Sequence, residues 1–232
     1  MIIGVIGASG NIGQRVLREA LVRGHKVIGF SRDPGQVKER GADIEWQAMD
    51  VLDPASVAAG IEAVDVVISL FQPGNASRDL GDTVRRSIAD PGIYSRAAKS
   101  LLTAFRNHPR KRLIVVGGAG SLEIEPGLIG ADAPGLRESL EAIGLPGDYE
   151  IAVRGHSDAL DVFRLSNRLW TYFSPAAEIY PGERTGRFRL GGDQMIFDAA
   201  GRSRVSFEDI AVALVDEIEL PRHVQRRFTI GY

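Results

Sequence analysis

Three glycines near the amino terminus have the spacing of a phosphate-binding turn. Gly7, Gly10 and Gly13 follow an apolar run of strand length at residues 1–6 and precede a helical pattern at residues 14–23. Gly7 allows a sharp turn, Gly10 leaves room for a pyrophosphate, and Gly13 lets the helix pack close to the sheet. The helix N-terminus adds unpaired N–H groups and a positive dipole end. This pattern predicts nucleotide binding through phosphates, with a purely structural turn as the alternative.

The residues after the second expected strand select the nucleotide. That strand spans residues 26–30, and Arg32 lies nineteen residues beyond Gly13. A carboxylate at this place accepts hydrogen bonds from a free ribose 2′-hydroxyl, whereas a guanidinium pairs with a 2′-phosphate. Arg32 therefore predicts NADP (NADPH). NAD is the alternative if Asp33 turns inward instead, and a solvated loop charge at Arg32 would favour neither cofactor.

Apolar runs and helical patterns alternate along the rest of the chain, which is typical of βα units. They predict an α/β fold of the doubly wound Rossmann type, with a mainly parallel sheet and helices on both faces. One domain is expected over residues 1–232, and residues 174–206 are expected to contribute a small substrate-side lobe. The other expected elements are strands at 44–48, 64–70, 112–116 and 168–173, β pieces at 188–190 and 194–197, an edge strand at 227–230, helices at 34–40, 94–105, 149–165 and 208–219, a loop or loose helix at 75–90, and a lid-like segment at 123–148.

Further cofactor contacts are expected where the parallel strands end. Asp50 follows the third strand and is placed to accept from the adenine amino group, while Val51 packs on the ring. Alternatively, Asp50 or Asp53 caps the helix that begins at Pro54. The predicted cofactor-binding residues are Gly7, Ser9, Gly10, Asn11, Ile12, Gly13, Ser31, Arg32, Asp50, Val51, Leu70, Phe71, Gly117, Gly118, Ser174, Pro175 and Ala176.

Composition narrows the class of protein. The chain has 232 residues, of which 44% are hydrophobic and 25% charged, and its net charge is −2. No basic field calls for nucleic acid or an anionic membrane surface. The chain contains no cysteine, which excludes disulfides and thiolate metal sites. The acidic residues have no metal-ligand spacing, so no metal is predicted. No segment has the pattern of a signal peptide or membrane span, so the expected location is cytoplasmic. The oligomeric state stays open.

The glycine pattern Gly7-x-x-Gly10-x-x-Gly13 resembles that of atypical short-chain dehydrogenases/reductases. More narrowly, nearly the whole length of the chain is similar to a bacterial family described as NADH-flavin reductases, related to NmrA-like proteins and to biliverdin-IXβ/flavin reductase. The most specific segments of this resemblance are residues 115–122, 174–177 with 181–186, 190–194, and 227–232.

The resemblance also shows a departure from the larger superfamily, which reduces carbonyls with a Tyr-x-x-x-Lys pair. Here Ala152 stands at the tyrosine position and His156 at the lysine position. His156 is a candidate to orient the nicotinamide ribose or to donate a proton, and a buried helix histidine is the alternative. Ser121 is a candidate to bond the carboxamide or the substrate, and a turn cap is the alternative. These two are the predicted catalytic residues.

Loss of the pair favours an acceptor that needs no proton donor from the protein. Hydride transfer to a ketone creates an alkoxide that needs a nearby acid. Transfer to a flavin or quinone creates a delocalised anion that takes its proton from water. A floor of Gly117, Gly118 and Gly120 with Phe71 and Tyr180 nearby would suit such a flat, small-molecule acceptor. The first hypothesis is an NADPH-dependent reductase; the others are an NADP(H)-binding redox sensor without turnover, and an isomerase or cyclase.

Overall fold

The computed structural model describes residues 1–38, 41–74 and 79–232. In these residues one eight-stranded sheet has the order β10-β12-β8-β5-β4-β1-β2-β3. Every neighbouring pair is parallel except β10 with β12, which is antiparallel. The strands of this sheet are β1 (Ile2–Ile6), β2 (Lys26–Ser31), β3 (Ile44–Ala48), β4 (Val66–Ser69), β5 (Arg112–Val116), β8 (Leu169–Phe173), β10 (Arg189–Gly191) and β12 (Arg226–Gly231).

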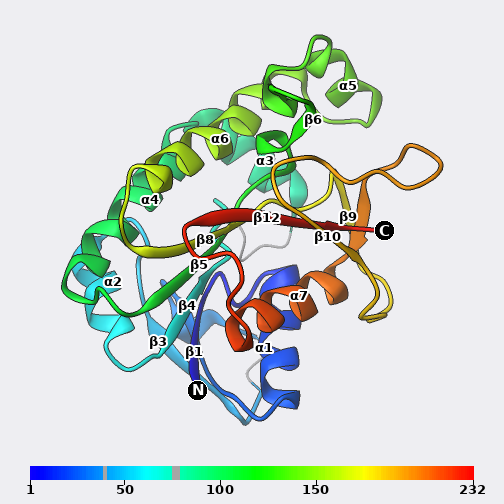
Figure 1. Cartoon of the computed structure of the whole chain (residues 1–232). Helices are drawn as coiled ribbons and strands as arrows, with labels where there is room; N and C mark the ends of the chain where they lie inside the picture. The colour runs from blue at the N-terminus through cyan, green and yellow to red at the C-terminus, as the bar shows by residue number, and fades with distance from the viewer. Residues whose placement is uncertain (39–40, 75–78) are drawn as a thin grey trace.

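Helices cover both faces of the sheet (Figure 1). One core joins the sheet to α1 and α7, and a second core joins the opposite face to α2, α4 and α6. The predicted doubly wound fold is therefore confirmed. The α-helices are α1 (Asn11–Val22), α2 (Pro54–Ile61), α3 (Leu80–Ala89), α4 (Ile93–Ala104), α5 (Leu136–Ala142), α6 (Glu150–Arg164) and α7 (Phe207–Glu219).

The local sequence accounts for the first βαβ unit. The β-branched residues of β1 are buried on both faces because the sheet is covered on both sides. The turn after β1 uses Gly7 at φ +77°, and α1 is followed by Gly24 at φ +81°. Both angles lie in the left-handed region that glycine adopts without a steric penalty. The predicted strand, turn, helix and strand are all present.

Several expected elements differ from the structure. The expected helix at 34–40 is a single 3₁₀ turn at Pro34–Gln36 within the described residues, and residues 39–40 lie outside them. Part of the segment 75–90 forms α3, while residues 75–78 are also outside the described range. The lid-like segment contains an antiparallel hairpin, β6 (Glu123–Glu125) with β7 (Leu128–Ile129), and helix α5. Its glycines and prolines separate these short elements.

The carboxyl-terminal strand was expected at the edge of the sheet, but it lies in the interior. β12 pairs with β8 on one side and with β10 on the other, so β10 forms the edge. The expected β piece at 194–197 is reduced to a bridge between Glu123 and Gln194. A separate parallel pair joins β9 (Glu178–Tyr180) to β11 (Arg204–Ser206). These pairings connect segments far apart in the sequence, which local patterns do not report.

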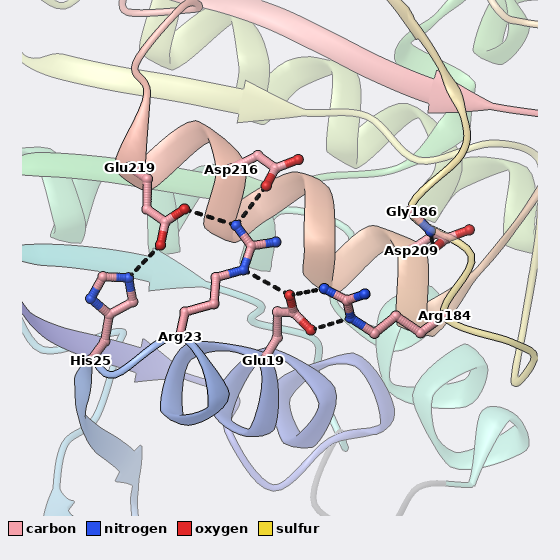
Figure 2. A network of polar contacts seen from close by, with 8 residues as sticks. All are labelled: Glu19, Arg23, His25, Arg184, Gly186, Asp209, Asp216 and Glu219. Carbon is pink, nitrogen blue, oxygen red and sulfur yellow. Dashed lines mark hydrogen bonds and ion pairs between the residues drawn. The ribbon is translucent and has the colours of Figure 1, made fainter.

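Polar contacts fasten the loop after β9 to helices α1 and α7 (Figure 2). Glu19 of α1 accepts two hydrogen bonds from Arg184, both at 2.7 Å, and one from Arg23 at 2.8 Å. Asp209 of α7 accepts from the Gly186 N–H at 2.8 Å. The loop at residues 181–187 is thereby connected to the helix that begins at the glycine turn.

Candidate functional site

The predicted contacts converge at the carboxyl ends of the central strands. The chain passes from β1 to β2 and β3 on one side and to β4 and β5 on the other, which defines a topological switch point. Ligands of open α/β sheets bind in the crevice outside such a point. Leu70 follows β4, and its N–H donates to the carbonyl oxygen of Ile6, the last residue of β1, at 2.9 Å. Gly117 follows β5, and its N–H donates to the carbonyl oxygen of Phe173, the last residue of β8, also at 2.9 Å.

The glycine turn leaves room and donors for an anion. A Cβ added at Gly13 would lie 2.3 Å from the Gly7 carbonyl oxygen, so a larger residue is excluded there. The close approach is thus to the turn itself, a more local contact than the predicted one with the sheet. Helix α1 begins after Gly10 with no side-chain cap and no acidic residue in its first turn. Within the described residues, the N–H groups of Asn11 and Ile12 have no acceptor. These features fit a pyrophosphate.

Arg32 and Asp33 occupy different environments at the end of β2. One oxygen of the Asp33 carboxylate accepts from the Gly35 N–H at 3.0 Å and caps the turn at Pro34–Gln36. The Asp33 N–H in turn donates to the Ser31 hydroxyl at 3.3 Å. Arg32 is exposed, and the described part of the chain offers its guanidinium no ion pair. Arg32 is therefore available to an anionic ligand, whereas Asp33 is partly used in local structure.

Asp50 and Asp53 were both candidates to cap the helix at Pro54, and the structure assigns the cap to Asp53. Asp53 caps α2 by accepting from the Ala55 N–H at 3.0 Å. Asp50 accepts from the Leu52 N–H at 3.0 Å through one oxygen and is half-buried beyond β3. Val51 is buried in the core against the α2 face of the sheet. Asp53 is thus the cap, and the adenine contact of Asp50 and Val51 stays a prediction.

His156 is buried in α6 beneath the loop that follows β5. Its ring lies over that of Tyr94, with 3.9 Å between the ring centroids. A Cβ added at Gly118 would lie 2.8 Å from His156 Cδ2, so the loop and the imidazole are in close contact. Only 6% of the residue is exposed, and this burial lowers the pKa of His156 from 6.5 to about 4. The imidazole is therefore neutral near pH 7.

Two residues that are not among the predicted site residues, Gln72 and Tyr94, contact His156. The Tyr94 hydroxyl donates to Gln72 Oε1 at 2.8 Å, and Gln72 Nε2 lies 3.4 Å from His156 Nε2. Phe71, beside Gln72, meets the Tyr94 ring edge-on at a centroid distance of 6.5 Å. Gln72 was visible in the sequence as a polar residue just after a central strand. Its partners are 22 and 84 residues away, so no local pattern identified them.

Ser121 is placed as a structural residue. Its hydroxyl donates to the Gly118 carbonyl at 2.8 Å and lies 2.8 Å from the Ser174 hydroxyl. Because the Ser121 proton goes to Gly118, the Ser174 hydroxyl is the donor between the two serines. Ser121 is 2% exposed, and its carbonyl accepts from Arg227 of β12. These contacts match the turn-cap alternative, and its role as a substrate contact stays a prediction.

The glycines after β5 make room for side chains packed against them. A Cβ at Gly117 would lie 2.2 Å from the Tyr172 ring, and one at Gly120 would lie 2.1 Å from Val153. The predicted open floor is therefore filled on this side by α6 and β8. The remaining predicted contacts also lie at strand ends: Ser9 precedes α1, Leu70 and Phe71 follow β4, and the buried Ser174, Pro175 and Ala176 follow β8.

A cavity of about 570 Å³ lies between α5 and the first turns of α6. Figure 1 places α5 at the far end of the molecule from α1, whose N-terminus belongs to the glycine turn. The arginines that line this cavity are paired with carboxylates: Arg137 with Asp148, and Arg154 with Asp132. These charges satisfy one another, so we assign the cavity no ligand.

Across residues 1–38, 41–74 and 79–232, no group of three or more metal-ligating side chains is found. In the same part of the chain, none of the helices has the length and apolar character needed to cross a membrane.

The doubly wound sheet, the glycine turn and the topological switch point define a Rossmann-type protein that binds NAD(P). The sequence model of the NAD(P)H-binding family matches residues 7–221, and the chain belongs to that family. The family predicted from the sequence is confirmed.

Three solved structures of similar proteins cover the whole chain. A "putative exported protein" from Burkholderia pseudomallei is 39% identical, covers 100% of both chains and superposes with a TM-score of 0.80. A "putative epimerase" from Bacteroides thetaiotaomicron is 34% identical, with 100% of this chain and 96% of that chain covered and a TM-score of 0.80. A "putative NADH-flavin reductase" from Streptococcus pneumoniae is 26% identical, with 100% and 99% covered and a TM-score of 0.79.

Proposed function

We propose that this protein is an NADPH-dependent reductase of a flat acceptor such as a flavin or quinone. The observation that carries the proposal is that, among the described residues around His156, no side chain is an available proton donor. His156 is neutral near pH 7, the Tyr94 hydroxyl is bonded to Gln72, and the Tyr172 hydroxyl donates to the His156 carbonyl at 2.8 Å. Burial also raises the pKa of both tyrosines.

An acceptor whose reduced form is a stabilised anion suits such a site. The bound cofactor would supply a hydride, which carries two electrons and one hydrogen to the acceptor. Water then supplies one proton, so the acceptor gains two hydrogens in total while the nicotinamide is oxidised. The protein's contribution is to hold the two rings in reactive contact. The glycine turn and the N-terminus of α1 would hold the pyrophosphate, and Gly117 and Gly118 would border the nicotinamide end.

The choice of NADP over NAD rests on Arg32. Its exposed guanidinium at the end of β2 is free to form a charge-assisted contact with a 2′-phosphate. Asp33, the residue that would favour NAD, already caps the following turn. We also propose a substrate-side role for residues 174–206, because this segment follows β8 at its carboxyl end. A cytoplasmic location completes the proposal.

A screen of NADPH oxidation against an acceptor panel tests this function. The panel contains FMN, riboflavin, a benzoquinone, a naphthoquinone, an aldehyde and a ketone. We expect turnover with one or more of the flavins and quinones and background rates with the carbonyl compounds. A preference for the aldehyde or ketone would overturn the proposal, because those substrates need a proton donor.

The same missing donor favours a second candidate, an NADP(H)-binding redox sensor without turnover. A sensor needs the intact phosphate turn and Arg32 but no chemistry at His156. Tight NADPH binding, measured by calorimetry, together with background oxidation across the whole panel would select this candidate over the reductase.

A further inference from the structure

The contacts around Gln72 form a chain with a defined direction. Gln72 Oε1 is a carbonyl oxygen and only accepts, so the Tyr94 hydroxyl must donate its proton to it. The Ser87 hydroxyl lies 2.8 Å from the Tyr94 oxygen and 2.8 Å from the Thr83 carbonyl, and it donates to either. Gln72 Nε2 is a donor, so the facing Nε2 of His156 is the acceptor. The proton of the neutral imidazole is then on Nδ1.

This chain orients an amide at the switch point. Gln72 follows β4 and is half-buried, with Phe71 and Tyr94 packed beside it. An amide nitrogen carries two N–H groups, and one of them is directed to His156. For the second, no acceptor exists in residues 1–38, 41–74 and 79–232. Toward the described residues, Gln72 therefore keeps one N–H of its oriented amide unused, just beyond the carboxyl end of β4.

The other polar side chains of the site are less available. The Ser121 and Ser174 hydroxyls are buried and bonded to each other, and the Tyr172 hydroxyl is committed to the His156 carbonyl. His156 offers its Nε2 lone pair to Gln72. Among these groups, Gln72 alone combines partial exposure, a fixed orientation and an unused N–H.

We infer that Gln72 donates a hydrogen bond to a carbonyl oxygen of the reducible acceptor, and that Tyr94 and His156 are positioning residues that hold its amide. The inference rests on the proposed reductase function. Hydride addition places negative charge on the carbonyl oxygens of a quinone or flavin, and an oriented N–H stabilises that charge more in the transition state than in the ground state. Water still supplies the proton, and Gln72 loses none.

Three test variants, one control, one variant for signal assignment and two measurements test this assignment. Gln72→Leu removes the donor, Gln72→Glu keeps the shape but replaces N–H by a carboxylate oxygen, and Tyr94→Phe removes the hydroxyl that holds the amide. Ser157→Ala is the control, because Ser157 adjoins His156 on α6 and its buried hydroxyl has no hydrogen-bond partner among the described residues. The measurements are steady-state kinetics with the best acceptor of the panel and ¹⁵N NMR of the His156 imidazole, identified by its loss in His156→Asn.

Removal of the donor should lower kcat about 10²-fold, with little change in NADPH affinity. Tyr94→Phe should lower kcat by roughly 10-fold, a smaller effect because the amide remains but is no longer fixed. NMR should show the Nδ1–H tautomer in the unmutated protein and the control. In Gln72→Glu the proton should move to Nε2, where the new oxygen accepts it.

Two results would overturn this assignment alone: wild-type kcat in Gln72→Leu, or an Nε2–H tautomer in the unmutated protein. Inactivity of the unmutated protein with every acceptor would overturn the reductase function together with the donor role of Gln72. The two failures are therefore distinguishable.

Discussion

The charge of His156 follows from its burial rather than from a charged partner. An imidazolium needs solvent or a carboxylate to be stable, and the aromatic face of Tyr94 and the Gly118 loop exclude water from this ring. The pKa of about 4 means that the folded protein binds a proton at His156 only in acid. A histidine of this kind serves as a hydrogen-bond acceptor at neutral pH.

This burial predicts a dependence of stability on pH. Between about 6.5 and 4 the unfolded chain binds a proton that the folded chain does not, so stability is present above this window and is lost as pH falls through it. We expect a loss of about 2 kcal/mol between roughly pH 7 and pH 5 from His156 alone. Urea unfolding at both pH values should show that His156→Gln lacks this component and that Ser157→Ala retains it. An equal pH dependence in all three proteins would contradict the buried neutral state.

Arg32 should decide cofactor preference at the other end of the site. The unmutated protein should bind NADPH more tightly than NADH by about 1–3 kcal/mol, through a charge-assisted contact with the 2′-phosphate. Calorimetry should show that Arg32→Ala removes most of this difference and leaves NADH affinity nearly unchanged. Asp33→Asn is the companion variant: a marked loss of NADH affinity in it would show that Asp33 contacts the ribose, and that NAD is the cofactor.

At the scale of elements, the network around Glu19 joins three parts of the chain that are distant in sequence. Glu19 is 5% exposed, and it bonds Arg23, the residue after α1, and Arg184 of the loop after β9 (Figure 2). Arg184 lowers the pKa of this carboxyl, so Glu19 is ionised. Arg23 extends the network to Asp216 and Glu219 on α7. The loop and α7 are thus fixed against α1.

The members of this network should differ in their effect on stability. Glu19→Gln should lower the free energy of unfolding by about 2 kcal/mol, because it leaves two guanidinium groups without their shared carboxylate. Arg184→Ala should cost less than ~1 kcal/mol, since this side chain is 54% exposed and Glu19 keeps Arg23. Urea unfolding measures both, with Arg164→Ala, which breaks an exposed pair with Asp161, as the control. A larger loss for Arg184→Ala than for Glu19→Gln would contradict the assignment of Glu19 as the centre.

At the scale of the whole molecule, the sequence predicted what depends on neighbours along the chain. The strand at Ile2–Ile6, the glycine turn that follows it and the span of Arg112–Val116 were all predicted from apolar runs and the turn residues that end them. The interior position of β12 did not, because it depends on β10 pairing outside it. The candidate site follows the same rule: its local features were predicted from the sequence, and its long-range contacts were not. The glycine turn is local, whereas Gln72 meets His156 across 84 residues and Ser121 meets Ser174 across 53.

Cofactor binding should stabilise the whole domain, because the phosphate turn, Arg32 and the strand ends come together only in the folded chain. NADPH at about 100 times its Kd should add about 2.7 kcal/mol, and a domain of this size should then gain roughly 5–10 °C in Tm. Thermal unfolding with and without cofactor measures the shift, and NADH at the same concentration should give a smaller one.

Variants at two glycines separate binding at the turn from binding elsewhere. Gly13→Ala places a Cβ 2.3 Å from the Gly7 carbonyl oxygen, which forces the backbone of the turn apart and should abolish the Tm shift. Gly192→Ala is the matched control, because an added Cβ there meets nothing within 4 Å, and it should keep the full shift. If Gly13→Ala does not fold, Arg32→Ala supplies the test, since its NADPH shift should fall to that of NADH. An unchanged NADPH shift in Gly13→Ala, or none in the unmutated protein, would place the cofactor away from the turn or exclude it.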